Sequence, residues 1–134
     1  MFIGMNLGDI QEAKPVPAGR YDLVISTAEF NAAKGDKGAN IKVSLGVEGH
    51  DTSPNVTHFI SIPKPDDDPQ KAHFKQLMLK RFLTQFEVPY DTTTGFNVED
   101  MPGCRASAML TLSEPDENNN IYNRLQLEKL KTEA

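Results

Sequence analysis

The sequence predicts an all-β fold with one helix, in which five short strands form a small barrel. Five segments alternate apolar and polar residues with a period of two, which is the pattern of half-buried strands. One segment between the third and the fourth carries apolar residues at helical spacing. Turn-forming Gly, Pro, Asn and Asp residues separate these segments. The chain has 134 residues, which fits one domain because domains hold roughly 150 residues.

The first three strands occupy the first half of the chain. A lead-in over residues 1–18 precedes a strand over 20–30, and a hairpin loop rich in Gly and Lys follows. Residues 40–48 alternate most clearly, and residues 56–62 form the third strand. The residues predicted to point inward from the second and third strands are Ile41, Val43, Leu45, Val47, Val56, His58, Ile60 and Ile62.

A helix is predicted after the third strand, over residues 69–87. Asp68 is suited to cap its N-terminus, and Pro69 is suited to the first helical position, where a missing N–H removes no hydrogen bond. Pro89 stops the helix. The apolar stripe predicted to face the barrel consists of Phe74, Leu77, Met78, Phe82 and Phe86.

Two further strands follow the helix. A long loop over residues 90–103 leads to a fourth strand over 104–112, and a turn leads to a fifth strand over 121–130. By alternation, Leu112 and Ile121 are both predicted to point inward.

This element order is that of the five-stranded OB-fold, in which one helix lies between the third and fourth strands. Closure of such a barrel removes exposed strand edges. An open α+β sheet with one covering helix is the alternative. We expect a single OB-fold domain with a lead-in over 1–18, a barrel over 19–130 and a short tail over 131–134.

Aromatic and basic side chains share the predicted outward faces of the strands. Phe59 lies on the third strand and Tyr122 on the fifth, among small polar residues. This mixture suits single-stranded nucleic acid, because bases stack on aromatic rings while cations follow the phosphates. Each aromatic residue could instead belong to a second small core or to an oligomer interface. The outward cations are Lys42, Arg105 and Arg124, and the loop after the first strand adds Lys34 and Lys37.

The overall charge does not favour a strongly basic nucleic-acid binder, since the net charge is −5. Much of the acid lies in predicted loops, whereas the basic residues lie mainly on predicted strands and the helix. The chain can therefore be acidic and still have one basic face. The turn between the last two strands holds Glu114, Asp116 and Glu117, which would repel phosphate.

Catalytic and metal-binding chemistry finds little support in the sequence. His50, His58 and His73 have no metal-ligand spacing. Cys104 is the only cysteine and falls on the predicted inner face, where a packed thiol is expected. We expect a protein that is not an enzyme and that has no metal and no cofactor. No stretch approaches the roughly 20 apolar residues of a membrane span, so we expect a cytoplasmic protein.

Several segments resemble small bacteriophage proteins encoded in replication and recombination gene clusters. Residues 16–25 carry Pro-x-Gly-x-Tyr, and residues 34–43 carry a Gly- and Lys-rich turn followed by Gly-x-x-Ile-x-Val. Three later segments are similar to the end of the family's helix, its next strand and its last hairpin: residues 83–89, 101–106 and 118–124. The resemblance covers roughly residues 15–130, and it depends on the order of the motifs.

The resemblance implies a phage OB-fold protein that coats single-stranded DNA without enzymatic activity, in the host cytoplasm. Phage replication or recombination proteins are implied partners, and a homo-oligomer, preferably a dimer, is expected. The alternative is a protein-interaction or oligomerisation module that does not itself bind DNA. The binding residues that the resemblance carries over to this chain are Lys34, Lys37, Lys42, Phe59, Arg105, Tyr122 and Arg124.

Overall fold

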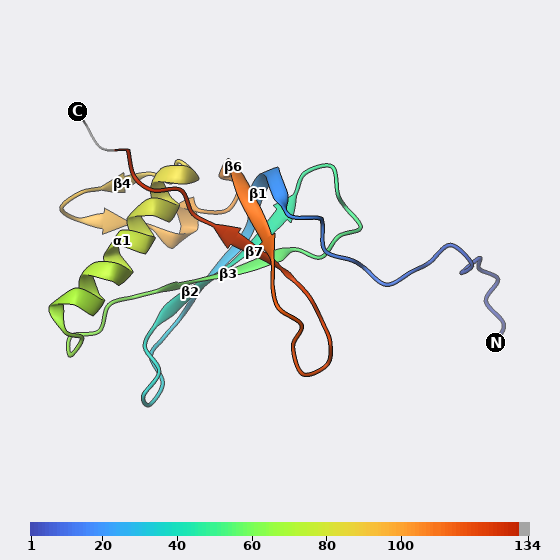
Figure 1. Ribbon diagram of the computed structural model, residues 1–134, viewed down its shortest axis with the longest axis horizontal. Coiled ribbons are helices and arrows are strands. Elements are labelled where there is room, and N and C mark those ends of the chain that lie inside the picture. Colours follow the sequence, from blue (N-terminus) through green and yellow to red (C-terminus); the bar gives the residue numbers. More distant parts are fainter. Residues whose placement is uncertain (132–134) are drawn as a thin grey trace.

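The computed structural model describes residues 1–131 and shows a mostly β protein with one α-helix (Figure 1). Its main sheet is antiparallel, with the strand order β3-β2-β1-β6-β7. The two strands that end this order, β3 and β7, also contact each other, so the sheet is a nearly closed barrel. The strand bounds are β1 (Gly19–Asn31), β2 (Asn40–Val47), β3 (Val56–Ser61), β6 (Arg105–Leu112) and β7 (Asn123–Gln126).

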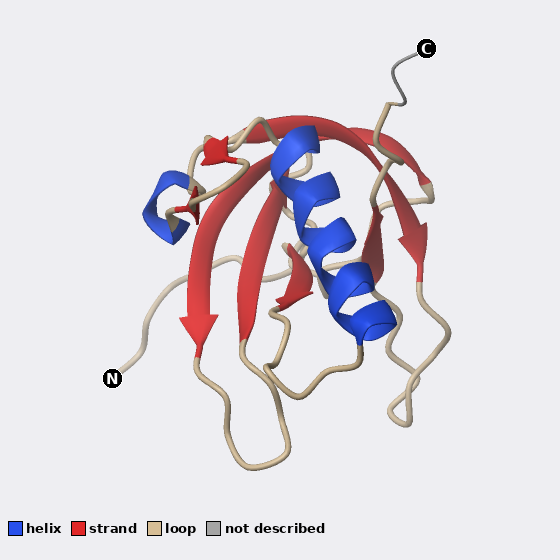
Figure 2. Ribbon diagram, turned by 90° about the vertical axis from the view of Figure 1, so that its left-hand side faces the viewer, coloured by secondary structure: helices blue, strands red, loops and turns tan. Residues whose placement is uncertain are grey.

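The predicted faces of β2 and β3 are confirmed. Val43 and Leu45 of β2 are fully buried, and Val56 and Ile60 of β3 are buried against them, while Phe59 points outward. A bulge between Ile25 and Thr27 interrupts the pairing of β1 with β2, and such bulges bend a strand and increase its twist. This bend helps the long first strand to curve around the barrel (Figure 2).

Helix α1 (Pro69–Gln85) begins as predicted and ends two residues earlier than predicted. The side chain of Asp68 accepts a hydrogen bond from the Lys71 amide at 2.8 Å, so it is the N-cap. The helix lies across the curved sheet (Figure 2), and its C-terminal half supplies the buried residues Phe82 and Leu83.

Phe74 is an exception to the predicted apolar stripe, because 60% of its surface is exposed. Each step of four residues turns the side-chain direction by about 40°, so the three steps from Phe74 to Phe86 turn it by about 120°. Phe86 is fully buried, and Phe74 therefore points away from the core that Phe86 occupies. The prediction that Phe74 packs in the core is wrong.

The loop predicted over residues 90–103 contains short regular elements. β4 (Tyr90–Asp91) pairs with β5 (Gly95–Phe96), and the 3-10 helix η1 (Val98–Asp100) follows. The carboxylate of Asp91 holds the turn, since its Oδ1 accepts hydrogen bonds from the Thr93 amide, the Thr93 hydroxyl and the Thr94 amide. These bonds lower the pKa of Asp91 to about 2.

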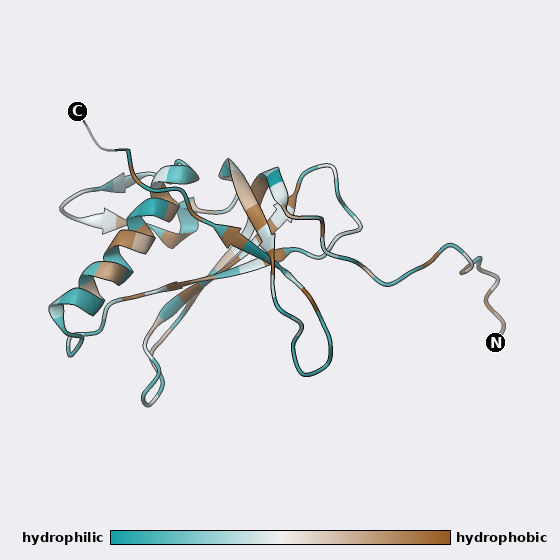
Figure 3. Cartoon of the chain, viewed as in Figure 1, coloured by the Kyte–Doolittle hydropathy of each residue, from teal (hydrophilic) through white to brown (hydrophobic). Residues whose placement is uncertain are grey.

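The last hairpin differs from its prediction in length. β7 covers only residues 123–126 of the predicted 121–130, and Leu112 and Ile121 are exposed although alternation assigns them to the core. They lie where the β6–β7 loop (residues 113–122) leaves the barrel, so their side chains are only partly covered. The largely hydrophilic colouring of this loop and of the β1–β2 hairpin tip fits their position outside the core (Figure 3).

Part of the lead-in belongs to the fold. Val16 is only 2% exposed, and the buried side chain of Asn123 fixes its backbone with two hydrogen bonds. Asn123 Oδ1 accepts from the Val16 amide at 2.9 Å, and Asn123 Nδ2 donates to the Val16 carbonyl at 2.8 Å. The Tyr21 hydroxyl also donates to the Pro17 carbonyl. Residues 1–14, in contrast, are exposed and extend away from the barrel (Figure 1). Within residues 1–131, no helix has the length and apolar character needed to cross a membrane.

The pH dependence of stability follows from His58, whose imidazole stacks on Phe82 with 5.5 Å between ring centroids. Burial lowers the pKa of His58 from 6.5 to about 4. Between these values the unfolded chain binds a proton that the folded chain excludes, so lowering the pH destabilises the fold. We expect the free energy of unfolding to fall by about 3 kcal/mol as the pH drops from 6.5 to 4, measured by urea unfolding.

The variant His58→Leu serves as the control for this titration. It should remove most of the pH dependence in this window. Asp67, Asp91 and Asp116 have pKa values lowered below 3.8, so most of their contribution to stability is lost below about pH 4. A pH dependence in His58→Leu equal to that of the wild type would contradict the assignment to His58.

Candidate nucleic-acid interface

Phe59 stands at the centre of the outward face that the sequence singled out. Its side chain is 56% exposed, and the antiparallel register places it directly opposite Lys42 on β2. Directly opposed residues on one sheet face have Cβ atoms roughly 5 Å apart. An exposed ring and an ammonium group are thus neighbours on the surface, as base stacking and phosphate contact together require.

A groove of about 420 Å³ joins this face to β7, because β3 and β7 meet at the barrel closure. Phe59 lines it from one side, and Tyr122 and Arg124 line it from the other. Tyr122 is 48% exposed, so two aromatic rings and one guanidinium border one open groove. We name it the β3–β7 groove. Its remaining lining residues are Pro15, Pro54, Asn55, Thr57, Ile121 and Asn123.

The acidic loop between β6 and β7 holds Tyr122 in place. The Tyr122 hydroxyl donates to Asp116 Oδ2 at 2.5 Å, and Asp116 Oδ1 accepts from the amides of Asn118 and Asn120. These hydrogen bonds lower the pKa of Asp116, and the bond to Asp116 raises the pKa of Tyr122. Asp116 was expected only to repel phosphate, but its carboxylate orients the ring and is already hydrogen-bonded.

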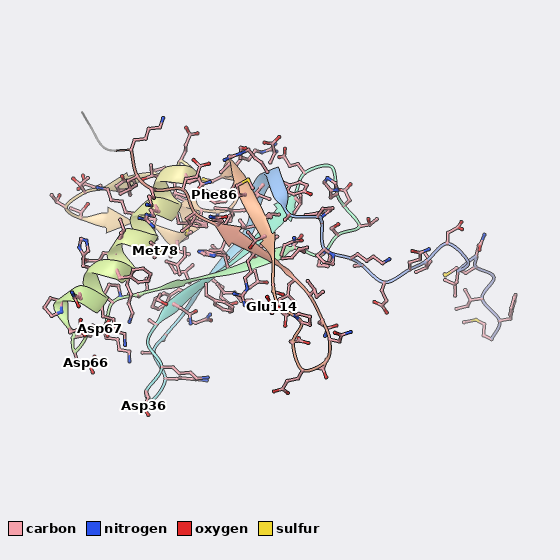
Figure 4. The ribbon with its side chains drawn as sticks, viewed as in Figure 1. Asp36, Asp66, Asp67, Met78, Phe86 and Glu114 are labelled. Atoms are coloured by element: carbon pink, nitrogen blue, oxygen red, sulfur yellow. The ribbon has the colours of Figure 1, made fainter. Side chains whose placement is uncertain are left out.

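Lys34 and Lys37 lie at the tip of the β1–β2 hairpin. They pair with each other through both backbone hydrogen bonds, and Gly35 between them has a φ of 55°, which suits the glycine position of a type II′ turn. The Lys64 ammonium donates to the Asp36 carbonyl at 2.9 Å and ties the tip to the segment after β3. Asp36 at this tip and Glu114 in the β6–β7 loop project toward the same side of the barrel (Figure 4).

Arg105 is not part of the β3–β7 groove. Its Nη1 donates to Glu48 Oε1 at 2.5 Å in an ion pair. It borders a separate cavity that Asp22, Glu48 and Glu87 also line. Because three carboxylates surround that cavity, it is unfavourable for phosphate. Of the seven residues predicted from the sequence, Phe59, Tyr122 and Arg124 share one groove and Lys42 is adjacent to Phe59. Lys34 and Lys37 lie apart from it at the hairpin tip, and Arg105 borders a separate cavity.

A second groove extends the aromatic surface onto the helix. The sequence did not predict this groove. It measures about 430 Å³ and lies between β3 and α1, with Phe59 and the exposed Phe74 among its lining residues. Lys71 and Lys75 add positive charge, although Lys75 forms an ion pair with the buried carboxylate of Asp67 at 2.8 Å. Asp67 lies in the turn before α1, and Met78 lies farther along the helix beside the groove (Figure 4). We name it the β3–α1 groove.

Other chemistry has little support in the described structure. Within residues 1–131, no group of three or more His, Cys, Asp or Glu side chains could hold a metal ion. The Cys104 thiol donates to the Asp100 carbonyl, and burial raises its pKa, which makes it a poor nucleophile. Comparison of the chain with known protein families and with curated proteins gave no match.

Proposed function

We propose that this chain is a non-enzymatic single-stranded DNA-binding protein of the OB-fold type, with little sequence preference. One observation carries the proposal: Phe59, Tyr122 and Arg124 line a single open groove, with Lys42 beside Phe59. Stacking on exposed rings does not depend on base identity, because every base has a π-face. The resemblance to phage replication and recombination proteins supports a role in coating strands during those processes.

The geometry favours unpaired strands over duplex. Rings that stand exposed on a strand face can stack only on bases that are not already stacked in a double helix. The net charge of −5 also argues against binding that depends on charge alone. The strand order β3-β2-β1-β6-β7, with the helix between β3 and β6, supports the OB-type barrel.

Salt dependence tests the electrostatic part of this proposal. The cations assigned to the strand are Arg124 in the groove, Lys42 beside Phe59, and Lys34 and Lys37 at the β1–β2 hairpin tip. If about four phosphates are neutralised, log affinity should fall with log salt at a slope near −3, from −0.7 for each. Fluorescence anisotropy with a labelled single strand of about 30 nucleotides measures this slope, and the matching duplex is the control. Equal affinity for strand and duplex, or an affinity independent of salt, would contradict the proposal.

A further inference from the structure

A cluster of basic residues lines a cavity that is separate from both grooves. This cavity of about 540 Å³ opens between α1, the start of β1 and the segment that follows β7, and among residues 1–131 Glu128 is the only acidic residue that lines it. We name it the polybasic pocket. It holds five of the 14 Lys and Arg residues of a chain with net charge −5. These five cations are Arg20, Lys80, Arg81, Lys129 and Lys131.

The single carboxylate does not neutralise these cations. Glu128 Oε1 accepts from Arg20 Nη2 at 2.7 Å and forms an ion pair with it. Among residues 1–131, no ion pair involves Lys80, Arg81, Lys129 or Lys131. Arg81 also has a buried Nε with no hydrogen-bond partner. Four of the five cations therefore have no anionic partner within this part of the chain.

Helix stability does not explain the charge. Cations stabilise a helix through the macrodipole only in its last turn, and the last turn of α1 contains no basic residue. Lys80 and Arg81 lie one turn earlier and repel the lysines of the C-terminal segment. Such a concentration of like charge costs stability unless an anion binds to it.

We propose that the polybasic pocket binds consecutive phosphate groups of a nucleic-acid strand, as a second contact for the strand held in the grooves. This inference rests on the proposed function. The C-terminal segment links the two surfaces, because Leu127 lines the β3–α1 groove and residues 128–131 line the pocket. A strand that leaves Phe74 along this segment reaches the cations.

The lining favours a nucleic acid over an acidic peptide. The exposed ring of Tyr90 borders the pocket and offers a face for a base or a sugar, and the Thr84 hydroxyl beside it offers a hydrogen bond. Cations combined with an aromatic face are the recognition pattern for single strands. The planar guanidinium of Arg81 matches phosphate oxygens in a two-pronged contact.

The test compares two lengths of single strand. We expect Lys80→Ala/Lys129→Ala to weaken binding of a strand of about 20 nucleotides by about tenfold, and to reduce its salt slope by about 1.4. A strand of about six nucleotides, which the grooves alone accommodate, should bind this variant as it binds the wild type. Both lysines are exposed, so folding is preserved. The matched control is Lys80→Arg/Lys129→Arg, which keeps both charges and should retain wild-type affinity for both lengths.

The outcomes separate this inference from the proposed function. Unchanged affinity of Lys80→Ala/Lys129→Ala for the longer strand would overturn the polybasic pocket as a contact. A second outcome would also overturn it: a poly-glutamate peptide binds the wild type but not Lys80→Ala/Lys129→Ala, while both proteins bind the longer strand equally. That result would assign the pocket to a protein partner. Phe59→Ala could leave the affinity for both lengths unchanged while the lysine variant binds the longer strand more weakly. That result would contradict the grooves as the binding site and still support the polybasic pocket as a contact.

Discussion

Phe59→Ala should weaken binding to single-stranded DNA by about 5- to 150-fold, which corresponds to about 1–3 kcal/mol for one stacked base. The effect is expected to be this large because Phe59 lines both the β3–β7 and the β3–α1 groove. Among residues 1–131, no other aromatic residue borders both grooves. Fluorescence anisotropy with a labelled single strand measures the change, and the free energy of unfolding should be nearly unaffected because the ring is exposed.

Phe30→Ala is a matched control for this prediction. Phe30 is 54% exposed, close to the value for Phe59, but it lies near the end of β1 and lines neither groove. It should bind single strands like the wild type. Equal losses in the two variants would mean that general surface hydrophobicity, and not the grooves, determines binding.

The same variant distinguishes the alternative function. If the outward aromatic residues form an interface between copies of the chain, Phe59→Ala should change the sedimentation coefficient while DNA binding stays the same. If the ring stacks on bases, Phe59→Ala should weaken DNA binding and leave the sedimentation coefficient unchanged. Loss of assembly with intact DNA binding would favour a protein-interaction module.

Alternation of apolar and polar residues predicted the buried and outward faces correctly where a strand crosses the middle of the barrel. In β2 and β3, the apolar residues of one face are buried and the residues of the other face are half-buried or exposed, so Ile41 and Phe59 could be assigned from alternation alone. Alternation does not reveal where the barrel ends, and for that reason Leu112 and Ile121 were assigned to the core. Helical spacing failed for Phe74 because a stripe built from steps of four residues turns gradually around the helix.

The remaining features depend on contacts between distant parts of the chain. Val16 and Asn123 are separated by 107 positions, yet their hydrogen bonds fix the lead-in beside the groove. An isolated asparagine in a strand pattern gives no sign of such a partner. In the sequence, Asp116 does not differ from the other acidic residues of its loop, although its hydrogen bond orients Tyr122. The polybasic pocket likewise gathers residues from β1, α1 and the C-terminal segment, which no local pattern joins.

Phe82→Ala should lower the free energy of unfolding by about 3–5 kcal/mol, the usual cost of removing a buried aromatic ring. Phe82 is fully buried and packs between two rings, Phe86 at 4.5 Å and His58 at 5.5 Å between centroids. It therefore connects α1 to β3, the strand that carries Phe59. Since domains are stable by only about 5–15 kcal/mol, this loss is a large fraction of the total. Urea unfolding at neutral pH measures it.

Phe74→Ala provides the control, because it removes the same ring from the same helix at an exposed position. Its free energy of unfolding should change by no more than about 0.5 kcal/mol. The two variants should also differ in their pH dependence. Removing Phe82 opens the site beside His58 to water, so the pKa of His58 should return toward 6.5 and the destabilisation between pH 6.5 and pH 4 should shrink. In Phe74→Ala that destabilisation should persist in full. Equal pH dependence in the two variants would show that His58 does not owe its low pKa to the contact with Phe82.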